Sequence, residues 1–175
     1  VVRRDGRLVW VRDEASIARR PDGQPLFLQG VMVDVTDGKQ AEQDLQESEQ
    51  RYRRLVEMSP DAIAVHCDGR FVYINPAGMR LLGASRPEEI VGKSIYEVVH
   101  PDYHAVVEER VRQQLHELRP APLIHERYRR LDGTVVDVEV ASTPIVYRGR
   151  PAIQVVARDI THRKRVEERL RAHAR

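Results

Sequence analysis

An internal repeat constrains the fold of this chain more than any other feature of its sequence. The segment from Asp34 to Leu45, DVTDGKQAEQDL, is echoed 125 residues later from Asp159 to Leu170, DITHRKRVEERL. Upstream of each copy, an Asp-Gly pair, an apolar run, a Gly-x-Pro step and a second apolar run recur in the same order at offsets of 125 to 127 residues. Because self-similarity at a fixed offset marks a duplicated structural unit, the chain holds parts of two copies of one domain type.

The repeat divides the chain into four parts. We expect residues 1–36 to be the C-terminal part of a preceding repeat, residues 37–58 a helical linker, residues 59–161 a complete domain, and residues 162–175 the start of an output-linker helix. A chain of 175 residues can bury one modest core, which suits one complete domain and a remnant of another. The remnant should form a two-strand hairpin within residues 7–36. Its apolar side chains, including Trp10, Leu26 and Leu28, would leave it disordered or covered by another surface, because an isolated hairpin is marginally stable.

Composition excludes several classes of protein. The 29 basic and 27 acidic residues nearly cancel, which argues against a dedicated nucleic-acid surface. The single cysteine, Cys67, excludes an intrachain disulfide and a zinc site built from several thiolates, and it fits a reducing, cytoplasmic setting. No run approaches the roughly 18 apolar residues of a membrane helix, so we expect no direct membrane insertion, although a parent protein could be anchored elsewhere.

Local patterns in the complete repeat predict a mixed α+β domain. Pro76 opens a short helix that Gly83 ends, and an amphipathic helix runs from Pro101-Asp102 to Leu118. The expected order is strands at 62–66 and 71–75, helices at 76–82, 88–91 and 102–118, and strands at 124–131, 134–146 and 152–160. This order indicates an antiparallel sheet with helices packed on one face.

The linker carries a coiled-coil pattern. Residues 39–58 contain no proline or glycine, and small or apolar side chains recur at alternating steps of four and three residues. The expected dimer seam comprises Ala41, Leu45, Tyr52 and Leu55, and it restarts after the second repeat at Val166 and Leu170. Because so short a helix is marginal alone in water, we expect the seam to be buried against a second copy in a homodimer.

These features together resemble the PAS family with its C-terminal PAC segment. The resemblance rests on residues 52–63 (YRRLVEMSPDAI), YINPA at 73–77, Gly83 through Gly92-Lys93, His100-Pro-Asp102, RRLDG at 129–133 and the closing Asp159-Ile-Thr161, and it covers residues 52–171 with a partial copy at 3–51. It implies a five-stranded sheet of order 2-1-5-4-3 that cups helices around a small cavity, with a signalling helix leaving after Asp-Ile-Thr. Such domains sense small ligands or redox state, mediate dimerisation and relay to an output domain.

Two sets of residues are candidates for function. Asp159, Ile160 and Thr161, with Asp34 and Thr36 in the first copy, stand where a strand becomes a helix; they cap the helix, act as a hinge for signal relay, or do both. Strand alternation and the short helix suggest a cavity lined by Val65, Ile74, Met79, Leu82, Tyr128, Val138, Val140, Val155 and Ala157, with Arg127 and Tyr128 as polar contacts. The alternative is that these residues only fill a core.

No cofactor or metal is expected. Haem-binding relatives carry an axial histidine on the long helix, where this chain has Val107 in an ungapped comparison. Flavin-binding relatives need a reactive cysteine in a helix whose counterpart here is residues 75–80, NPAGMR, whereas Cys67 lies in a hairpin. His100 and His104 have a chelating spacing, but no third ligand accompanies them.

The sequence offers no catalytic motif, so we expect a non-enzymatic module. The expected function is a sensory, signal-relay and dimerisation module of a bacterial-type protein, with a possible small-molecule ligand and a downstream output domain from a diguanylate cyclase or a two-component histidine kinase. The alternative is a structural dimerisation adaptor with an occluded core.

Overall fold

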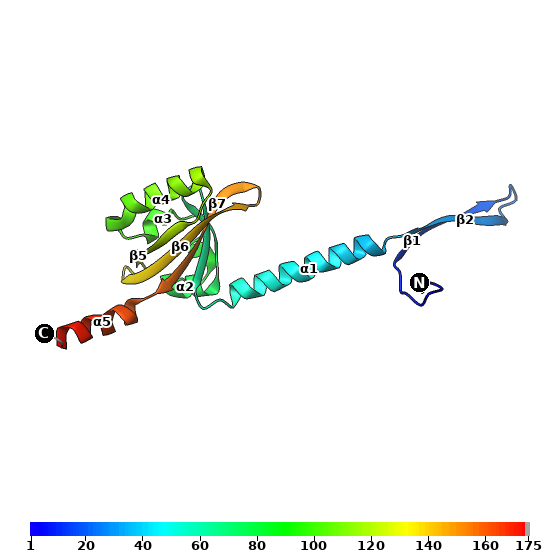
Figure 1. Ribbon diagram of the computed structural model, residues 1–175. Coiled ribbons are helices and arrows are strands. Elements are labelled where there is room, and N and C mark those ends of the chain that lie inside the picture. The colour runs from blue at the N-terminus through cyan, green and yellow to red at the C-terminus, as the bar shows by residue number, and fades with distance from the viewer. Residues whose placement is uncertain (174–175) are drawn as a thin grey trace. The chain divides into compact units, whose positions relative to one another are not determined.

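The structure is a computed structural model that describes the backbone of residues 1–173 and the side chains of residues 1–167, 169 and 170 (Figure 1). It divides into two compact units, one comprising Val1–Arg53 and the other beginning at Arg54.

The first unit is a hairpin followed by most of a long helix. Strands β1 (Val11–Arg19) and β2 (Pro25–Asp34) pair antiparallel, with Val11 opposite Asp34, and helix α1 (Thr36–Glu57) follows directly. The hairpin and the linker helix therefore form where the sequence predicts them. Trp10 is 59% exposed and Leu28 is 70% exposed, so the apolar side chains of the ordered hairpin lie open to solvent.

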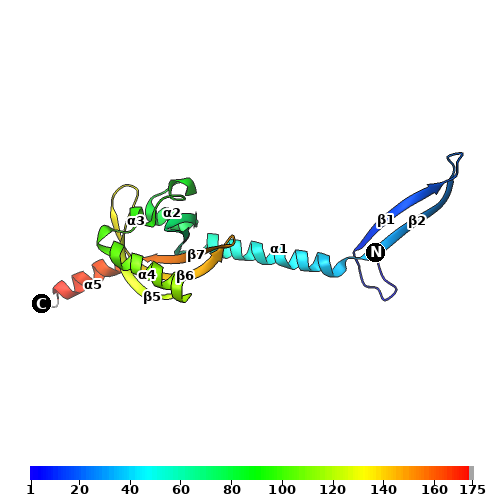
Figure 2. The same cartoon turned by 90° about the horizontal axis from the view of Figure 1, so that it is seen from above.

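The second unit is an α+β domain built on one antiparallel sheet. Its strands are β3 (Ala62–Cys67), β4 (Arg70–Ile74), β5 (Ala121–Arg129), β6 (Val135–Tyr147) and β7 (Arg150–Asp159). Its helices are α2 (Pro76–Leu82), α3 (Ile95–Val98), α4 (His104–Glu117) and α5 (Thr161–His173), with 3₁₀ turns at Pro87–Glu89 and Pro101–Tyr103. The sheet order is β4-β3-β7-β6-β5, which is 2-1-5-4-3 when the strands of this domain are counted from its start. The predicted fold class and strand order are confirmed, and Figures 1 and 2 show α2, α3 and α4 on one side of the sheet.

Capping residues explain where the short helices begin and end. Asn75 accepts a hydrogen bond from the Gly78 amide, Pro76 occupies the first turn, and Gly83 adopts the left-handed conformation with φ of 75°. Helix α3 was not predicted from the sequence, although Ser94 and Glu97 form the reciprocal capping box that starts it. The expected helical turn at 88–91 is a 3₁₀ turn at Pro87–Glu89.

The main core lies between the helices and the inner face of the sheet. Ile90, Val136 and Val138 are among its fully buried side chains, and α2, α3 and α4 close over it. A smaller cluster on the outer face contains Val65 and Cys67. Since burial of one aliphatic side chain contributes about 1.5–3 kcal/mol, the main core carries most of the hydrophobic stabilisation of the domain.

Candidate functional site

A cavity of about 60 Å³ lies between the helices and the inner face of the sheet. Six of the residues predicted to line it do so, namely Ile74, Leu82, Tyr128, Val140, Val155 and Ala157. Met79 and Val138 instead pack in the surrounding core without lining the cavity. Most of the residues predicted to line a cavity therefore do surround this one.

The expectation for Val65 is wrong, because β3 alternates in the opposite sense: Ala62, Ala64 and His66 line the cavity, and a β-bulge in the partner strand β4 brings Ile74 to the same face as Ala64. His66 pairs with Phe71, but the register shifts between Val65 and His66, so that Ala64 pairs with Ile74. Phe71 and Ile74 consequently both line the cavity together with Ala64 and His66. Val65 lies on the other face of the sheet, in the cluster with Cys67 and Ala152.

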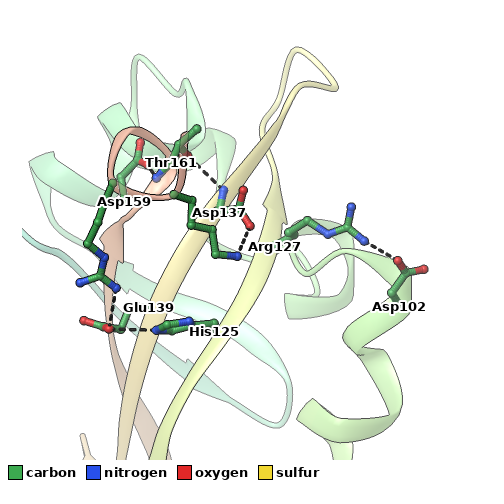
Figure 3. A network of polar contacts seen from close by, with 9 residues as sticks. Asp102, His125, Arg127, Asp137, Glu139, Asp159 and Thr161 are labelled. Atoms are coloured by element: carbon green, nitrogen blue, oxygen red, sulfur yellow. Dashed lines mark hydrogen bonds and ion pairs between the residues drawn. The ribbon is translucent and has the colours of Figure 1, made fainter. Parts of the chain in front are cut away.

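The expectation for Arg127 as a polar cavity contact is also wrong. Strand β5 alternates so that Glu126 and Tyr128 line the cavity. Arg127 hydrogen-bonds Asp102, and its guanidinium carbon lies 5.8 Å from the centroid of the Tyr103 ring. Arg127 therefore holds β5 to the turn before α4, as the right-hand part of Figure 3 shows for Asp102 and Arg127.

Several polar side chains that the sequence analysis did not select face the cavity. They are His66, Arg110, Gln114, Glu126 and Ser142. Among the residues that the structure describes, the buried side-chain atoms without a hydrogen-bond partner include Arg110 Nη2, Gln114 Oε1 and Glu126 Oε2. Gln114 and Glu126 are each only 3% exposed, and leaving a buried polar group unpaired costs about 1–3 kcal/mol. Three residues that line one cavity therefore each carry a buried polar atom without a hydrogen-bond partner.

Burial controls the charge state of the cavity. Burial raises the pKa of Glu126 to about 7, against opposing contributions from the Arg110 charge and a hydrogen bond with Tyr128. Burial lowers the pKa of His66 to about 4, so its imidazole is neutral at pH 7. Near neutral pH the cavity is thus lined by the Arg110 guanidinium, a Glu126 carboxyl that is partly protonated and partly ionised, and the neutral imidazole of His66.

The two positions that the sequence analysis compared with haem and flavin attachment sites lack the expected groups at the cavity. Val107, which an ungapped sequence comparison sets against the axial histidine of haem-binding relatives, lines the cavity with a side chain that cannot coordinate iron. Cys67 is buried on the opposite face of the sheet, away from the cavity. Absence of both chromophores stays a prediction. Within the described part of the chain, no three His, Cys, Asp or Glu side chains are grouped for a metal ion.

The histidines with chelating spacing have local roles instead. His100 Nδ1 accepts a hydrogen bond from the Asp102 amide at 3.4 Å and caps the 3₁₀ turn. His104 Nε2 lies 2.9 Å from the Val99 carbonyl oxygen, and its ring contacts that of Tyr96 edge to face. Both rings therefore hold the connection between α3 and α4 in place.

Asp159 and Thr161 form a hydrogen-bonded bracket where β7 becomes α5 (Figure 3). The Thr161 amide donates to Asp159 Oδ1 at 2.8 Å, and the Asp137 amide of β6 donates to Thr161 Oγ1 at 3.1 Å. Between them, the amide of the buried Ile160 donates to the Asp137 carbonyl at 2.9 Å. The bracket fixes the first turn of α5 to the neighbouring strand.

The first copy repeats this bracket contact by contact. The Thr36 amide donates to Asp34 Oδ1 at 3.0 Å, and the Trp10 amide donates to Thr36 Oγ1 at 3.0 Å. The Val35 amide donates to the Trp10 carbonyl at 2.9 Å, as Ile160 does in the second copy. The sequence repeat is therefore also a repeat of three-dimensional contacts.

Ion pairs add a second attachment to α5. Lys164 Nζ lies 2.7 Å from Asp137 Oδ1, and Arg163 Nη2 lies 3.2 Å from Glu139 Oε2. Hydrogen bonds from His125 and Arg163 lower the pKa of Glu139 and keep it ionised. In the first copy Trp10 and Arg12 stand where Asp137 and Glu139 stand in the second, so α1 begins without equivalent carboxylates on the strand. We call the four side chains Asp137, Glu139, Arg163 and Lys164 the α5 clamp.

Asn75 joins the domain to the helix that precedes it, as Asp159 and Thr161 join it to the helix that follows. Its side chain is fully buried and donates to the carbonyls of Val56, in the last turn of α1, and of Asp61. Its Oδ1 accepts hydrogen bonds from the amides of Ile63 and Gly78. One side chain thus joins the end of α1 to β3 and α2.

The side chains predicted to form a dimer seam lie on the helix surfaces. Leu45 is 62% exposed, and Ala41, Tyr52 and Leu55 are exposed along the same helix. On α5, Leu170 is exposed and Val166 is 40% exposed. Of the helices described, none is long and apolar enough to cross a membrane.

Comparison with known proteins agrees with the fold. A family model described as the PAS fold matches residues 50–160. The crystal structure of the PAS domain of an HTR-like protein from Haloarcula marismortui has a TM-score of 0.56 and 30% sequence identity, and the match covers 70% of this chain and 99% of that one.

Curated relatives include sensor proteins. Sporulation kinase A of Bacillus subtilis (strain 168) is 31% identical over 166 residues, which cover 95% of this chain and 27% of the kinase. The two-component sensor PprA of Pseudomonas aeruginosa is 39% identical over 93 residues, which cover 53% of this chain and 10% of the sensor. The chain thus spans only a minor part of the length of each.

Proposed function

Because the chain belongs to the PAS domain family, we propose that residues 59–161 are the sensory domain of a signal-transduction protein. In this proposal the domain responds to a molecule in its cavity or to its N-terminal neighbour. The response passes through α5 to a downstream output domain. The similarity to Sporulation kinase A supports a histidine kinase as that output, and a diguanylate cyclase is the other candidate. The setting proposed is the cytoplasm.

The proposal rests on one observation about β5 and β6. Some side chains of these strands line the cavity, and their sequence neighbours on the other face hold α5. Glu126 lines the cavity, while its neighbour His125 hydrogen-bonds Glu139 of the α5 clamp. On β6, Val140 lines the cavity next to Glu139. Because the backbone of each strand joins the two faces, a shift of β5 or β6 on ligand binding also moves the clamp.

We further propose that the protein is a parallel homodimer held by the seam of Ala41, Leu45, Tyr52 and Leu55 on α1, with Val166 and Leu170 extending it on α5. The exposure of these apolar side chains supports burial against a twin chain. Residues 1–36 are proposed to be the end of a preceding PAS repeat, a reading supported by the duplicated helix bracket.

The dimer is tested by cysteine cross-linking. Leu45→Cys and Gln43→Cys are compared, both with Cys67 replaced by alanine, since residue 43 lies off the seam on the same exposed helix. In a parallel dimer, mild oxidation cross-links Leu45→Cys efficiently and leaves Gln43→Cys largely monomeric. Equal cross-linking of the two variants, or none in either, contradicts the seam.

A second candidate function is a structural adaptor that only sets dimer geometry. The small volume of the cavity, about 60 Å³, favours it. The three unpaired polar atoms around the cavity favour the sensory role instead, because an occluded core gains nothing from unpaired groups.

A further inference from the structure

Three residues that line the cavity each carry a buried, unpaired polar atom, and these atoms differ in hydrogen-bonding character. Arg110 Nη2 can only donate, Gln114 Oε1 can only accept, and Glu126 Oε2 accepts when the carboxylate is ionised. Gln114 Nε2 is already used, since it donates to the Arg110 carbonyl at 3.3 Å, and this bond fixes which way the amide of Gln114 points. With Glu126 ionised, these three atoms therefore require one acceptor and two donors from a bound molecule.

The other walls limit what can carry these groups. The rest of the lining is largely aliphatic, and it includes Val107, Val111 and Val140. A volume of about 60 Å³ corresponds to about four to six small heavy atoms, if a water molecule needs about 10–15 Å³. The occupant is therefore compact, with a short apolar part and one polar end.

We propose that the cavity binds a small uncharged molecule that carries a primary carboxamide group. Its carbonyl oxygen accepts from Arg110, and its two N–H groups donate to Gln114 and Glu126. Its short alkyl part packs against the valines. This inference rests on the proposed sensory role and names the chemical class of the ligand.

Other small polar groups match the pattern less well. A carboxylate offers acceptors only, so it would satisfy Arg110 but face the oxygens of Gln114 and Glu126. A ketone offers one acceptor and leaves both oxygens unpaired. Water molecules can also fill the site, and they are the competitor that the experiment must exclude.

The test is a titration of the complete 175-residue chain with three probes of matched size, followed by backbone amide shifts in NMR spectra. The probes are propionamide, propionate and 2-butanone. We expect saturable shifts in α4 and β5, with a Kd for propionamide at least about tenfold below that of either other probe. Propionate or 2-butanone binding as tightly as propionamide, or no saturable binding of any probe, overturns the ligand class.

A pair of neighbouring glutamines supplies a matched control. Gln114→Met removes the acceptor at similar size, whereas Gln113→Met alters an exposed residue that hydrogen-bonds Glu109 on the outside of the same helix. We expect the first variant to weaken propionamide binding about fivefold or more and the second to leave it unchanged. Equal effects of the two variants overturn the assigned contact.

The outcome is separable from that of the proposed function. If cross-linking shows the seam but propionamide does not bind, only the ligand class fails. If propionamide binds and the seam does not cross-link, the dimeric relay fails while the site remains.

Discussion

The side-chain amide of Asn75 donates a hydrogen bond of 2.9 Å to the backbone carbonyl of Val56, in the last turn of α1. The same fully buried side chain makes three further hydrogen bonds, to Asp61, Ile63 and Gly78. The entering helix is therefore joined to the domain through a polar group that has its full set of partners.

We predict that Asn75→Ala lowers the free energy of unfolding by about 3 kcal/mol or more, because it leaves buried backbone groups unpaired. Urea denaturation of the whole chain measures this loss. Asn75→Asp, which keeps the acceptor and loses the donor to Val56, should also be destabilised. A loss below about 1 kcal/mol in Asn75→Ala would mean that water replaces these contacts.

Glu126 should make stability depend on pH. Its pKa is about 7 in the folded chain and ordinarily 4.5, so the folded state holds an extra proton between these values. The stabilisation from this proton is complete below about pH 4.5 and is lost as the pH rises through about 7. Relative to Glu126→Gln, the wild type should lose about 3 kcal/mol between about pH 4.5 and pH 8. Urea denaturation of both proteins at several pH values measures the difference.

His66 has an opposing effect on the pH dependence of stability. Because both the wild type and Glu126→Gln contain His66, this effect cancels in their comparison. Burial lowers the pKa of His66 to about 4, so its contribution to stability is present above about pH 6.5 and is lost as the pH falls through about 4. Arg110 and Tyr128 are the groups that act on Glu126 from α4 and β5. A pH-independent difference between wild type and Glu126→Gln would contradict the buried carboxyl.

The two helix brackets offer a matched pair of variants. Asp159→Ala removes the acceptor for the Thr161 amide and should raise hydrogen exchange in the first turn of α5 about five- to tenfold, since a lost N-cap costs about 1 kcal/mol. Asp34→Ala should do the same in the first turn of α1. Hydrogen-exchange mass spectrometry separates the two helices. Unchanged exchange in the helix that follows the substituted residue would show that these carboxylates do not cap.

The α5 clamp should be sensitive to salt. Lys164 and Asp137 are partly exposed, so their ion pair is worth at most about 1 kcal/mol and is screened by added ions. Lys164→Met should increase exchange in α5 at low salt, and the increase should vanish at high salt. Lys39→Met is the control, because Lys39 pairs with Glu42 within α1 rather than with a strand. An effect of Lys164→Met that is independent of salt would argue against an electrostatic attachment.

The sequence predicts the architecture well because turn and capping residues act locally. Asn75, Pro76 and Gly83 mark the bounds of α2, and the repeat itself reveals the strand-to-helix exits. The prediction for Val65 failed because the periodicity of β3 does not show which of its faces is the inner one, and the bulge in β4, which places both Phe71 and Ile74 at the cavity, depends on pairing between strands.

Part of the polar lining of the cavity could have been predicted from the pattern of residues along α4. Arg110 and Gln114 stand four residues apart, on the same stripe of α4 as Val107 and Val111. Polar side chains within an apolar stripe point to a buried polar site, but only the folded chain shows that Glu126 of β5 faces them. The separation of 12 residues between Gln114 and Glu126 gives no indication of that contact.

The most direct test of a dimeric, ligand-binding sensory domain is native mass spectrometry of the purified chain at low micromolar concentration. We predict a dimer that retains a small molecule in each subunit. A dimer of bare chains would instead favour the structural adaptor, and a bare monomer would contradict both the seam and the occupied cavity.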